Sequence, residues 1–175
     1  MANRKPEIRK FLEAEIESIR GLAGFFAGLM KNWLIDDDLV QTISLLIHDD
    51  KKFERLVAFT NAEDKNSGKN VSLVATSLGI KVISHEDRSL DYVIEYSDVH
   101  SVECNREGIL EAKYVVSIYT TAKKDFGWFF QTEIKSIMVD FTNKVKLALV
   151  AYEPMSNSLG SSDNSSKDEL VRRIK

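Results

Sequence analysis

Residues 71–84 read VSLVATSLGIKVIS, and this stretch decides the fold. It is rich in β-branched and small apolar residues and is broken at Leu78-Gly79, a pattern typical of two strands joined by a tight turn. Similar short segments with a period of two lie on both sides of it. The expected strands are Leu56–Thr60, Val71–Thr76, Ile80–Ser84, Tyr92–Tyr96, Val99–Cys104, Val115–Thr121 and Phe126–Thr132.

A single helix is expected after the last strand, because apolar residues then recur at three- and four-residue steps. This face comprises Ile134, Met138, Phe141, Val145, Ala148, Leu149 and Tyr152. Strands followed by one closing helix predict an α+β fold, in which a partly open antiparallel β-barrel or sandwich is capped by the C-terminal helix. The loop Asn61–Asn70 is expected to turn at Gly68.

Two helices are expected before the strands. The first runs from Pro6 to Trp33 with an amphipathic pattern, interrupted by Gly21, Gly24 and Gly28. Asp36 to Asp38 offer a capping carboxylate for a second helix, whose apolar stripe ends at Ile47. The chain therefore divides into an N-terminal helical segment at 1–50, a domain at 51–154, and a Ser-rich flexible tail at 155–175 that holds the start of a short helix.

Composition limits the function classes. The 175 residues are 43% hydrophobic with a net charge of −3, so the chain can bury a core and has no general basic field for nucleic acid. Its one cysteine, Cys104, excludes an internal disulfide framework and a zinc site built on several thiolates. The N-terminus lacks a signal-like apolar region, and the run Gly21–Met30 is half the length of a membrane span. We expect a cytoplasmic protein.

Three segments carry a resemblance to a known family: VSLVATSLGIKVIS, VIEYSDVHSVEC (93–104) and VVSIYTTAKKDFGWFF (115–130), followed by the amphipathic helix. Together they resemble the bacterial pleckstrin-homology-like (PH-like) domains of the YokE type. The shared features are a strand ending in Thr76 that turns into an apolar strand, and a Tyr-Ser-Asp-Val step at Tyr96 to Val99. The resemblance covers about Lys52 to Tyr152. In place of the usual cation after the turn Thr, this chain has Ser77.

No catalytic constellation is present in the sequence. Asp125-Phe126-Gly127 matches a kinase tripeptide, but no glycine-rich loop or catalytic loop accompanies it. The three histidines, at 48, 85 and 100, lack metal-ligand spacing. There is no P-loop, nucleophile elbow or dinucleotide fingerprint. We therefore expect no enzyme activity, no cofactor and no bound metal.

Lys65, Lys69 and Lys81 are the candidate contacts for an anionic lipid headgroup. The resemblance implies this region, because eukaryotic PH domains collect cations there around a lipid phosphate. Clustered ammonium groups bind phosphate through charge-assisted hydrogen bonds. Glu63 and Asp64 in the same loop dilute the positive charge, and an ordinary solvated loop is the competing interpretation.

Phe25, Phe26, Met30 and Trp33 form a second candidate surface at the end of the first helix. Such a patch can pack within the protein, pair with a second copy, or lie in a membrane interface. The polar face of the helix carries Glu13, Glu15 and Glu17, which argues against an anionic membrane. Packing within the protein or its oligomer is the favoured interpretation.

The sequence thus predicts a non-enzymatic binding or assembly module of bacterial or phage type. Its expected partner is another protein or a second copy, reached through open strand edges and the apolar helix. The alternative is peripheral membrane attachment through an anionic lipid headgroup. Nucleic acid is not an expected partner.

Overall fold

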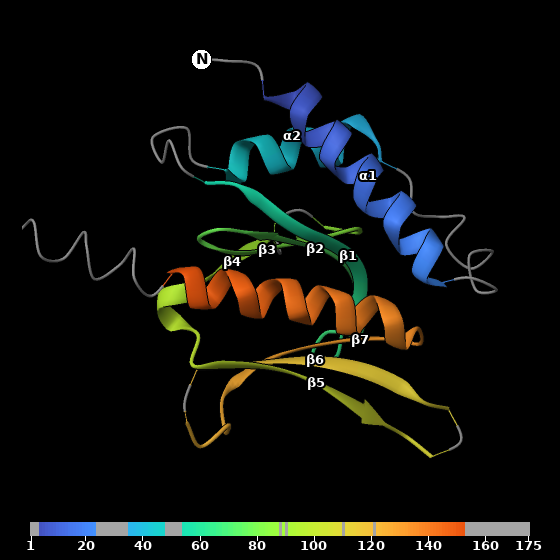
Figure 1. The fold of residues 1–175 in the computed structure, drawn as a ribbon, viewed down its shortest axis with the longest axis vertical. Coiled ribbons are helices and arrows are strands. Elements are labelled where there is room, and N and C mark those ends of the chain that lie inside the picture. The colour runs from blue at the N-terminus through green and yellow to red at the C-terminus, as the bar shows by residue number, and fades with distance from the viewer. Residues whose placement is uncertain are drawn as a thin grey trace, which may run out of the picture.

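A computed structural model of the chain describes residues 4–23, 35–47, 54–87, 89, 91–109, 111–120 and 122–152. The predicted order of helices, strands and final helix is confirmed (Figure 1). The helices are α1 (Lys5–Ala23), α2 (Asp37–Leu46) and a C-terminal helix at 135–152. The strands are β1 (Leu56–Asp64), β2 (Lys69–Thr76), β3 (Gly79–Ser84), β4 (Tyr92–Glu95), β5 (Ser101–Glu107), β6 (Lys113–Tyr119) and β7 (Gly127–Thr132), with a 3-10 turn η3 (Tyr96–Asp98) after β4.

The seven strands form one antiparallel sheet in the order β4-β3-β2-β1-β7-β6-β5. β1 joins the two halves through a short pairing with β7, in which Glu63 faces Gln131 and Asp64 faces Phe130. Among the described residues the sheet does not close, because the end strands β4 and β5 pair only with β3 and β6 and not with each other. This arrangement with its C-terminal helix confirms the expected α+β class, an open antiparallel sheet followed by a closing helix.

The C-terminal helix lies between the two halves of the sheet (Figure 1). Its residues Met138, Phe141 and Val145 pack in the main core and are at most 1% exposed. The inner faces of all the strands contribute to this core, including Leu73, Ile80, Ile94, Val116, Ile118 and Phe130. Full burial of one such side chain stabilises the fold by about 1.5–3 kcal/mol.

α1 and α2 cover the outer face of β1, β2 and β3. Leu12 and Ile43 are fully buried there against Phe59, Val74 and Ile83. Strands with apolar residues on both faces need a cover on each side. β3 is buried at all six positions, which follows from this double cover. α2 begins as predicted, because Asp36 accepts a hydrogen bond of 2.7 Å from the Leu39 amide.

Several boundaries differ from the sequence predictions. The first strand continues to Asp64 instead of ending at Thr60, so the turn shrinks to Lys65–Gly68. Polar residues continue the strand because they bond across it, as where Ser72 Oγ donates to Asn61 Oδ1 at 2.8 Å. Gly68 has φ of 69°, which confirms the predicted turn glycine.

The segment around Tyr96 was predicted as the end of one strand and Val99 as the start of the next. Instead, Tyr96–Asp98 form the 3-10 turn η3, and β5 begins at Ser101. Tyr96 is buried against Tyr152 of the C-terminal helix, with ring centroids 5.9 Å apart. This contact lies where the chain passes from β4, in one half of the sheet, to β5, in the other half.

Candidate functional site

Lys65 and Lys69 flank the β1–β2 turn. Lys65 forms an ion pair with Glu107, and Lys69 Nζ lies 3.8 Å from Glu86 Oε2. Each ammonium group therefore already faces a carboxylate. Exposed pairs of this kind contribute about 1 kcal/mol or less. An anion that binds either lysine therefore has to displace only a weak ion pair.

Lys81 occupies a different environment from the one predicted. Its side chain is 3% exposed, and Nζ lies 3.1 Å from Oε1 of the fully buried Glu54. Thr76 Oγ1 donates to the same Glu54 oxygen at 2.7 Å. A lipid headgroup in solvent cannot reach this ammonium group. The prediction was wrong for Lys81, because this residue on β3 pairs with Glu54, which precedes β1. No sequence pattern indicates this pair.

The second predicted surface, Phe25, Phe26, Met30 and Trp33, lies outside the described residues. Within the described part of the chain, no helix combines the length and the apolar character needed to cross a bilayer.

β5 is one of the two end strands of the sheet, and it is longer than the other end strand, β4. β5 pairs with β6 along seven positions, from Ser101 facing Tyr119 to Glu107 facing Lys113. Its other edge pairs with no described strand. Asn105, Arg106 and Glu107 are exposed along this edge. Unpaired strand edges accept further strands through their free N–H and C=O groups.

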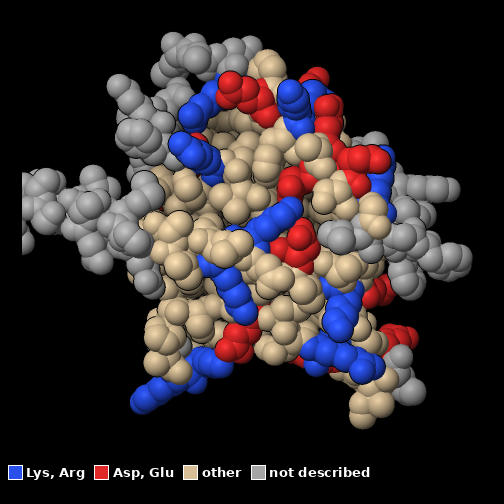
Figure 2. Space-filling view, in the orientation of Figure 1, with Lys and Arg blue, Asp and Glu red and all other residues tan. Residues whose placement is uncertain are grey.

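The C-terminal helix borders this edge. Cys104 of β5 contacts the side chain of Thr142, and Lys135 and Lys146 lie near enough for their charges to act on the Cys104 thiol. Residues 135, 142 and 146 are seven and four positions apart, which places them on one helix face. Figure 2 shows basic side chains, in blue, and acidic side chains, in red, next to one another across the middle of this side of the molecule.

The lysines on this helix face are unpaired in the described structure. Neither Lys135 nor Lys146 lies within ion-pair distance of a described carboxylate, whereas Lys144 on another face contacts both Glu15 and Asp140. Sequence reasoning missed the site, although the spacing of Lys135, Thr142 and Lys146 was available as a signal. That the face borders an open strand edge is known only from the fold.

Burial raises the pKa of the Cys104 thiol, an effect that the Thr142 contact and the charges of Lys146 and Lys135 only partly offset. The neutral thiol therefore dominates at neutral pH, and it is a poor nucleophile. Cys104 is partly buried and packs against the main core, which favours a packing role for its side chain.

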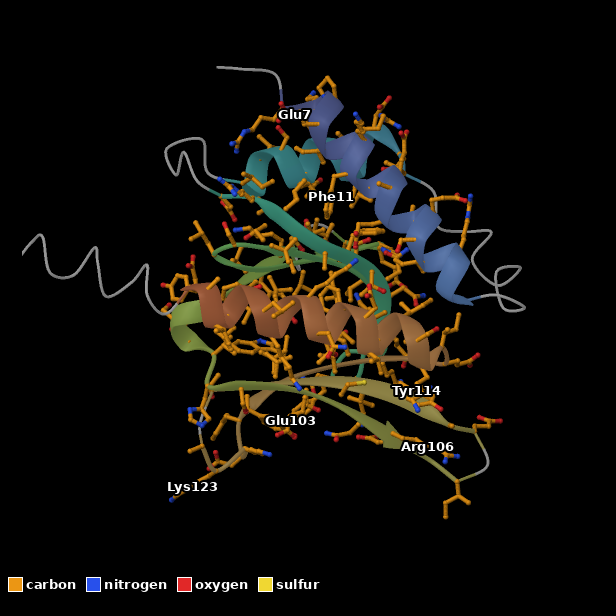
Figure 3. All side chains as sticks on the ribbon, in the orientation of Figure 1. Glu7, Phe11, Glu103, Arg106, Tyr114 and Lys123 are labelled. Carbon is orange, nitrogen blue, oxygen red and sulfur yellow. The ribbon has the colours of Figure 1, made fainter. Side chains whose placement is uncertain are left out.

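Glu103 precedes Cys104 on β5 and forms an ion pair with Lys124. Lys124 Nζ also lies 5.7 Å from the centroid of the Tyr119 ring. The hydrogen bond from Lys124 lowers the pKa of Glu103. In Figure 3, Glu103 and Arg106 lie along β5, and Lys123 lies on the connection between β6 and β7. The charge of Lys146 on the C-terminal helix also acts to lower the pKa of Glu103, so this carboxylate lies close to two cations.

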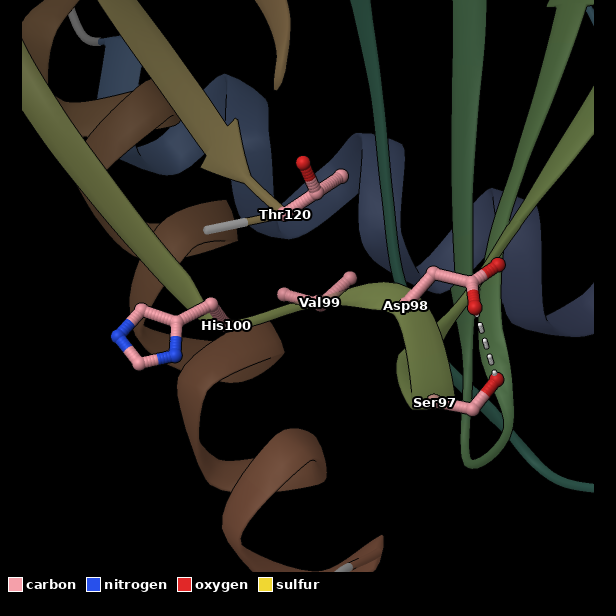
Figure 4. Close-up of a pocket in the computed structure, with 5 residues that line it drawn as sticks. All are labelled: Ser97, Asp98, Val99, His100 and Thr120. Carbon is pink, nitrogen blue, oxygen red and sulfur yellow. Dashed lines mark hydrogen bonds between the residues drawn. The ribbon is translucent and has the colours of Figure 1, made fainter. Parts of the chain in front are cut away.

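A polar hollow of about 400 Å³ opens at the start of β5, lined by Ser97, Asp98, Val99, His100 and Thr120. In Figure 4, Ser97 and Asp98 contact each other, and His100 points to the other side of Val99. No described group of three metal-ligating side chains converges anywhere in this structure.

No protein-family model matches the chain, and no curated protein matches it. Among solved structures, the chain is similar to a pleckstrin homology domain from Shewanella amazonensis, with 13% identity, a TM-score of 0.46, and coverage of 65% of this chain and 97% of that one. It is also similar to the complex of the FERM and C-terminal domains of Drosophila Merlin, with 15% identity, a TM-score of 0.46, and coverage of 71% of this chain and 38% of that one. The chain is thus similar, at low identity, to PH-like structures.

Proposed function

We propose that this chain is a non-enzymatic binding module of bacterial or phage type that works in the cytoplasm through contact with another protein or with a second copy of itself. The observation that carries the proposal is the open edge of β5 beside the C-terminal helix. Folds of the PH-like kind are typically binding modules, and a free sheet edge is a common way to bind a polypeptide.

Two observations support a binding role over catalysis. The pKa of the Cys104 thiol is raised by burial, which lowers the fraction of reactive thiolate. In the polar hollow, His100 lies on the other side of Val99 from the Ser97–Asp98 contact, so the imidazole is not aligned with that hydroxyl.

A photo-reactive benzoylphenylalanine at Asn105 tests the proposal, with the same residue at Glu13 of α1 as the matched control. Both positions are exposed, but only Asn105 lies on the β5 edge. Irradiation of cells that produce the full chain should join Asn105, and not Glu13, to a polypeptide. Mass spectrometry then distinguishes a second copy from another protein. Failure to join any polypeptide from Asn105 would contradict the proposal.

Attachment to an anionic membrane is the alternative. Ile109, at the connection between β5 and β6, is 93% exposed and follows two residues after Glu107, the partner of Lys65. An apolar tip beside a cation is a feature of peripheral membrane contacts. Cosedimentation with phosphatidylserine vesicles that is lost in Lys65→Ala/Lys69→Ala would support this alternative. Vesicle binding that is indifferent to these changes would exclude the lysine site.

A further inference from the structure

We propose that residues 167–174 of this chain dock on the outer side of its own C-terminal helix, where Leu147 and Val150 form an exposed apolar patch. The proposal concerns the surface of this helix and does not depend on the β5 edge. It names the occupant of the patch as a segment of the same polypeptide.

The patch lies on the last two turns of the C-terminal helix (Figure 1). Leu147 is 72% exposed and Val150 is 66% exposed. A helix rotates by about 100° per residue, so these two positions point about 140–160° away from the buried Val145. Because they are three residues apart, they are neighbours on the helix surface. The helix therefore presents apolar side chains on a side that the described core does not cover.

The sequence after the helix supplies a matching apolar face. Leu170, Val171 and Ile174 follow one another at steps of one and three residues, a spacing that places them on one face of a helix. Leu170 and Ile174 are about one helical turn apart, as Leu147 and Val150 are. Two apolar pairs with this spacing can therefore meet side by side.

The length of the chain permits this contact. Residues 153–166 join the helix to the segment and are rich in Ser and Asn. A polar chain of this length spans about 20 Å on average, whereas Lys146 lies about 9 Å before Tyr152 along the helix axis. The segment can therefore reach back beside its own helix. Because it is tethered, its effective concentration is about millimolar, and a weak intrinsic affinity is enough to populate the docked state.

Charge favours one direction of docking. Lys146 is exposed and directly precedes Leu147. The segment carries Asp168 and Glu169 directly before Leu170. When the segment runs parallel to the helix, so that Leu170 meets Leu147, these two carboxylates lie beside the Lys146 ammonium group. An antiparallel segment would move the carboxylates away from this cation. The parallel direction is therefore favoured.

Methyl NMR of the full chain, with labelled Leu and Val side chains, tests the docking. The double variant Leu170→Asp/Ile174→Asp should shift the methyl signals of Leu147 and Val150, because the loss of the apolar contact exposes these side chains to water. A circular dichroism spectrum of each variant verifies that it is folded.

Two control variants make the comparison specific. Met155→Asp/Leu159→Asp adds the same charge to residues 153–166, outside the docking segment, and should leave both methyl signals unchanged. Lys146→Glu should lower the docking equilibrium constant by about threefold. Lys135→Glu, a charge reversal at the other end of the same helix, should leave it unchanged.

A nitroxide label distinguishes the chain's own segment from that of a second copy. The label is placed by Arg172→Cys in a Cys104→Ser background, which leaves one thiol to react. It should broaden the methyl signals of Leu147 and Val150 within the labelled chain. In a mixture of nitroxide-bearing chains with isotope-labelled chains that lack the nitroxide, these signals should stay sharp.

Unchanged methyl signals in Leu170→Asp/Ile174→Asp would overturn the proposal. An equal effect of Met155→Asp/Leu159→Asp would also overturn it, because the contact would then not be specific to residues 167–174. Broadening that arises between different chains would assign the patch to a second copy and would contradict docking within one chain. Crosslinking from Asn105 tests the proposed binding function separately.

Discussion

Glu15 of α1 and Lys144 of the C-terminal helix are joined by two hydrogen bonds of 3.0 Å across 129 positions of the chain. Glu15 Oε2 also accepts a hydrogen bond of 3.3 Å from the Phe59 amide on β1. One carboxylate therefore ties the N-terminal helix both to the sheet and to the closing helix. Asp140 completes the cluster at 3.0 Å from Lys144.

Glu15→Gln should destabilise the protein by about 1–3 kcal/mol, because it removes the charge that Lys144 needs in a partly buried site. Glu13→Gln, two positions away and exposed, should change the free energy of unfolding by less than about 0.5 kcal/mol. Urea unfolding measures both. Equal stability of the two variants would show that the α1 cluster contributes nothing beyond apolar packing.

The same cluster predicts a dependence on alkaline pH. Burial lowers the pKa of Lys144, but the hydrogen bonds to Glu15 and Asp140 outweigh this effect and raise the pKa overall. A pKa raised by folding gives stability that is complete below the unfolded pKa of about 10.4 and is lost as the pH rises through the folded pKa. The stability gap between the parent chain and Lys144→Met should therefore be constant from pH 7 to 9 and shrink toward pH 11. A stability gap that grows with pH would contradict the conclusion that folding raises the pKa of Lys144.

The buried pair of Glu54 and Lys81 predicts a strongly non-additive mutant cycle. Lys81→Met leaves Glu54 as an unpaired buried carboxylate, and Glu54→Leu leaves the ammonium group unpaired, so each should cost about 3–5 kcal/mol. The double variant should recover most of this loss. Denaturant unfolding of the four proteins yields the coupling energy. Costs that simply add would mean that the two charges do not interact.

Two glycines predict opposite effects of the same substitution. A Cβ at Gly79 would lie 2.4 Å from the Ile94 carbonyl oxygen on the neighbouring strand, whereas nothing lies within 4 Å of a Cβ at Gly21 in α1. Gly79→Ala should therefore cost about 1–3 kcal/mol, and Gly21→Ala should stabilise the helix by up to about 1 kcal/mol. Thermal unfolding compares the two. A neutral Gly79→Ala would mean that β3 and β4 separate easily.

The fold was predictable from the sequence where local pattern and packing agree. The turn between Thr76 and Gly79 and the closing helix from Met138 to Val145 follow from residue types that match their final environment. Polar residues caused the boundary errors. Asn61 and Glu63 suggest a loop, yet they extend β1 because their partners, Ser72 and Gln131, come from other strands.

The candidate site was less predictable, because it depends on contacts between distant segments. Lys81 had the chemistry of a headgroup ligand in the sequence, but its pairing with Glu54 buries it. Lys135 and Lys146 belong to none of the motifs that the sequence interpretation used. Only the sheet order, which leaves β5 at an end, places them beside an open strand edge.

The most direct test of the central claim is crosslinking from benzoylphenylalanine at Asn105 of β5 in the full chain, with the same residue at Glu13 of α1 as the control. The account predicts a crosslink to a polypeptide from Asn105 and none from Glu13. Equal crosslinking from both positions, or none from Asn105, would contradict binding at the β5 edge.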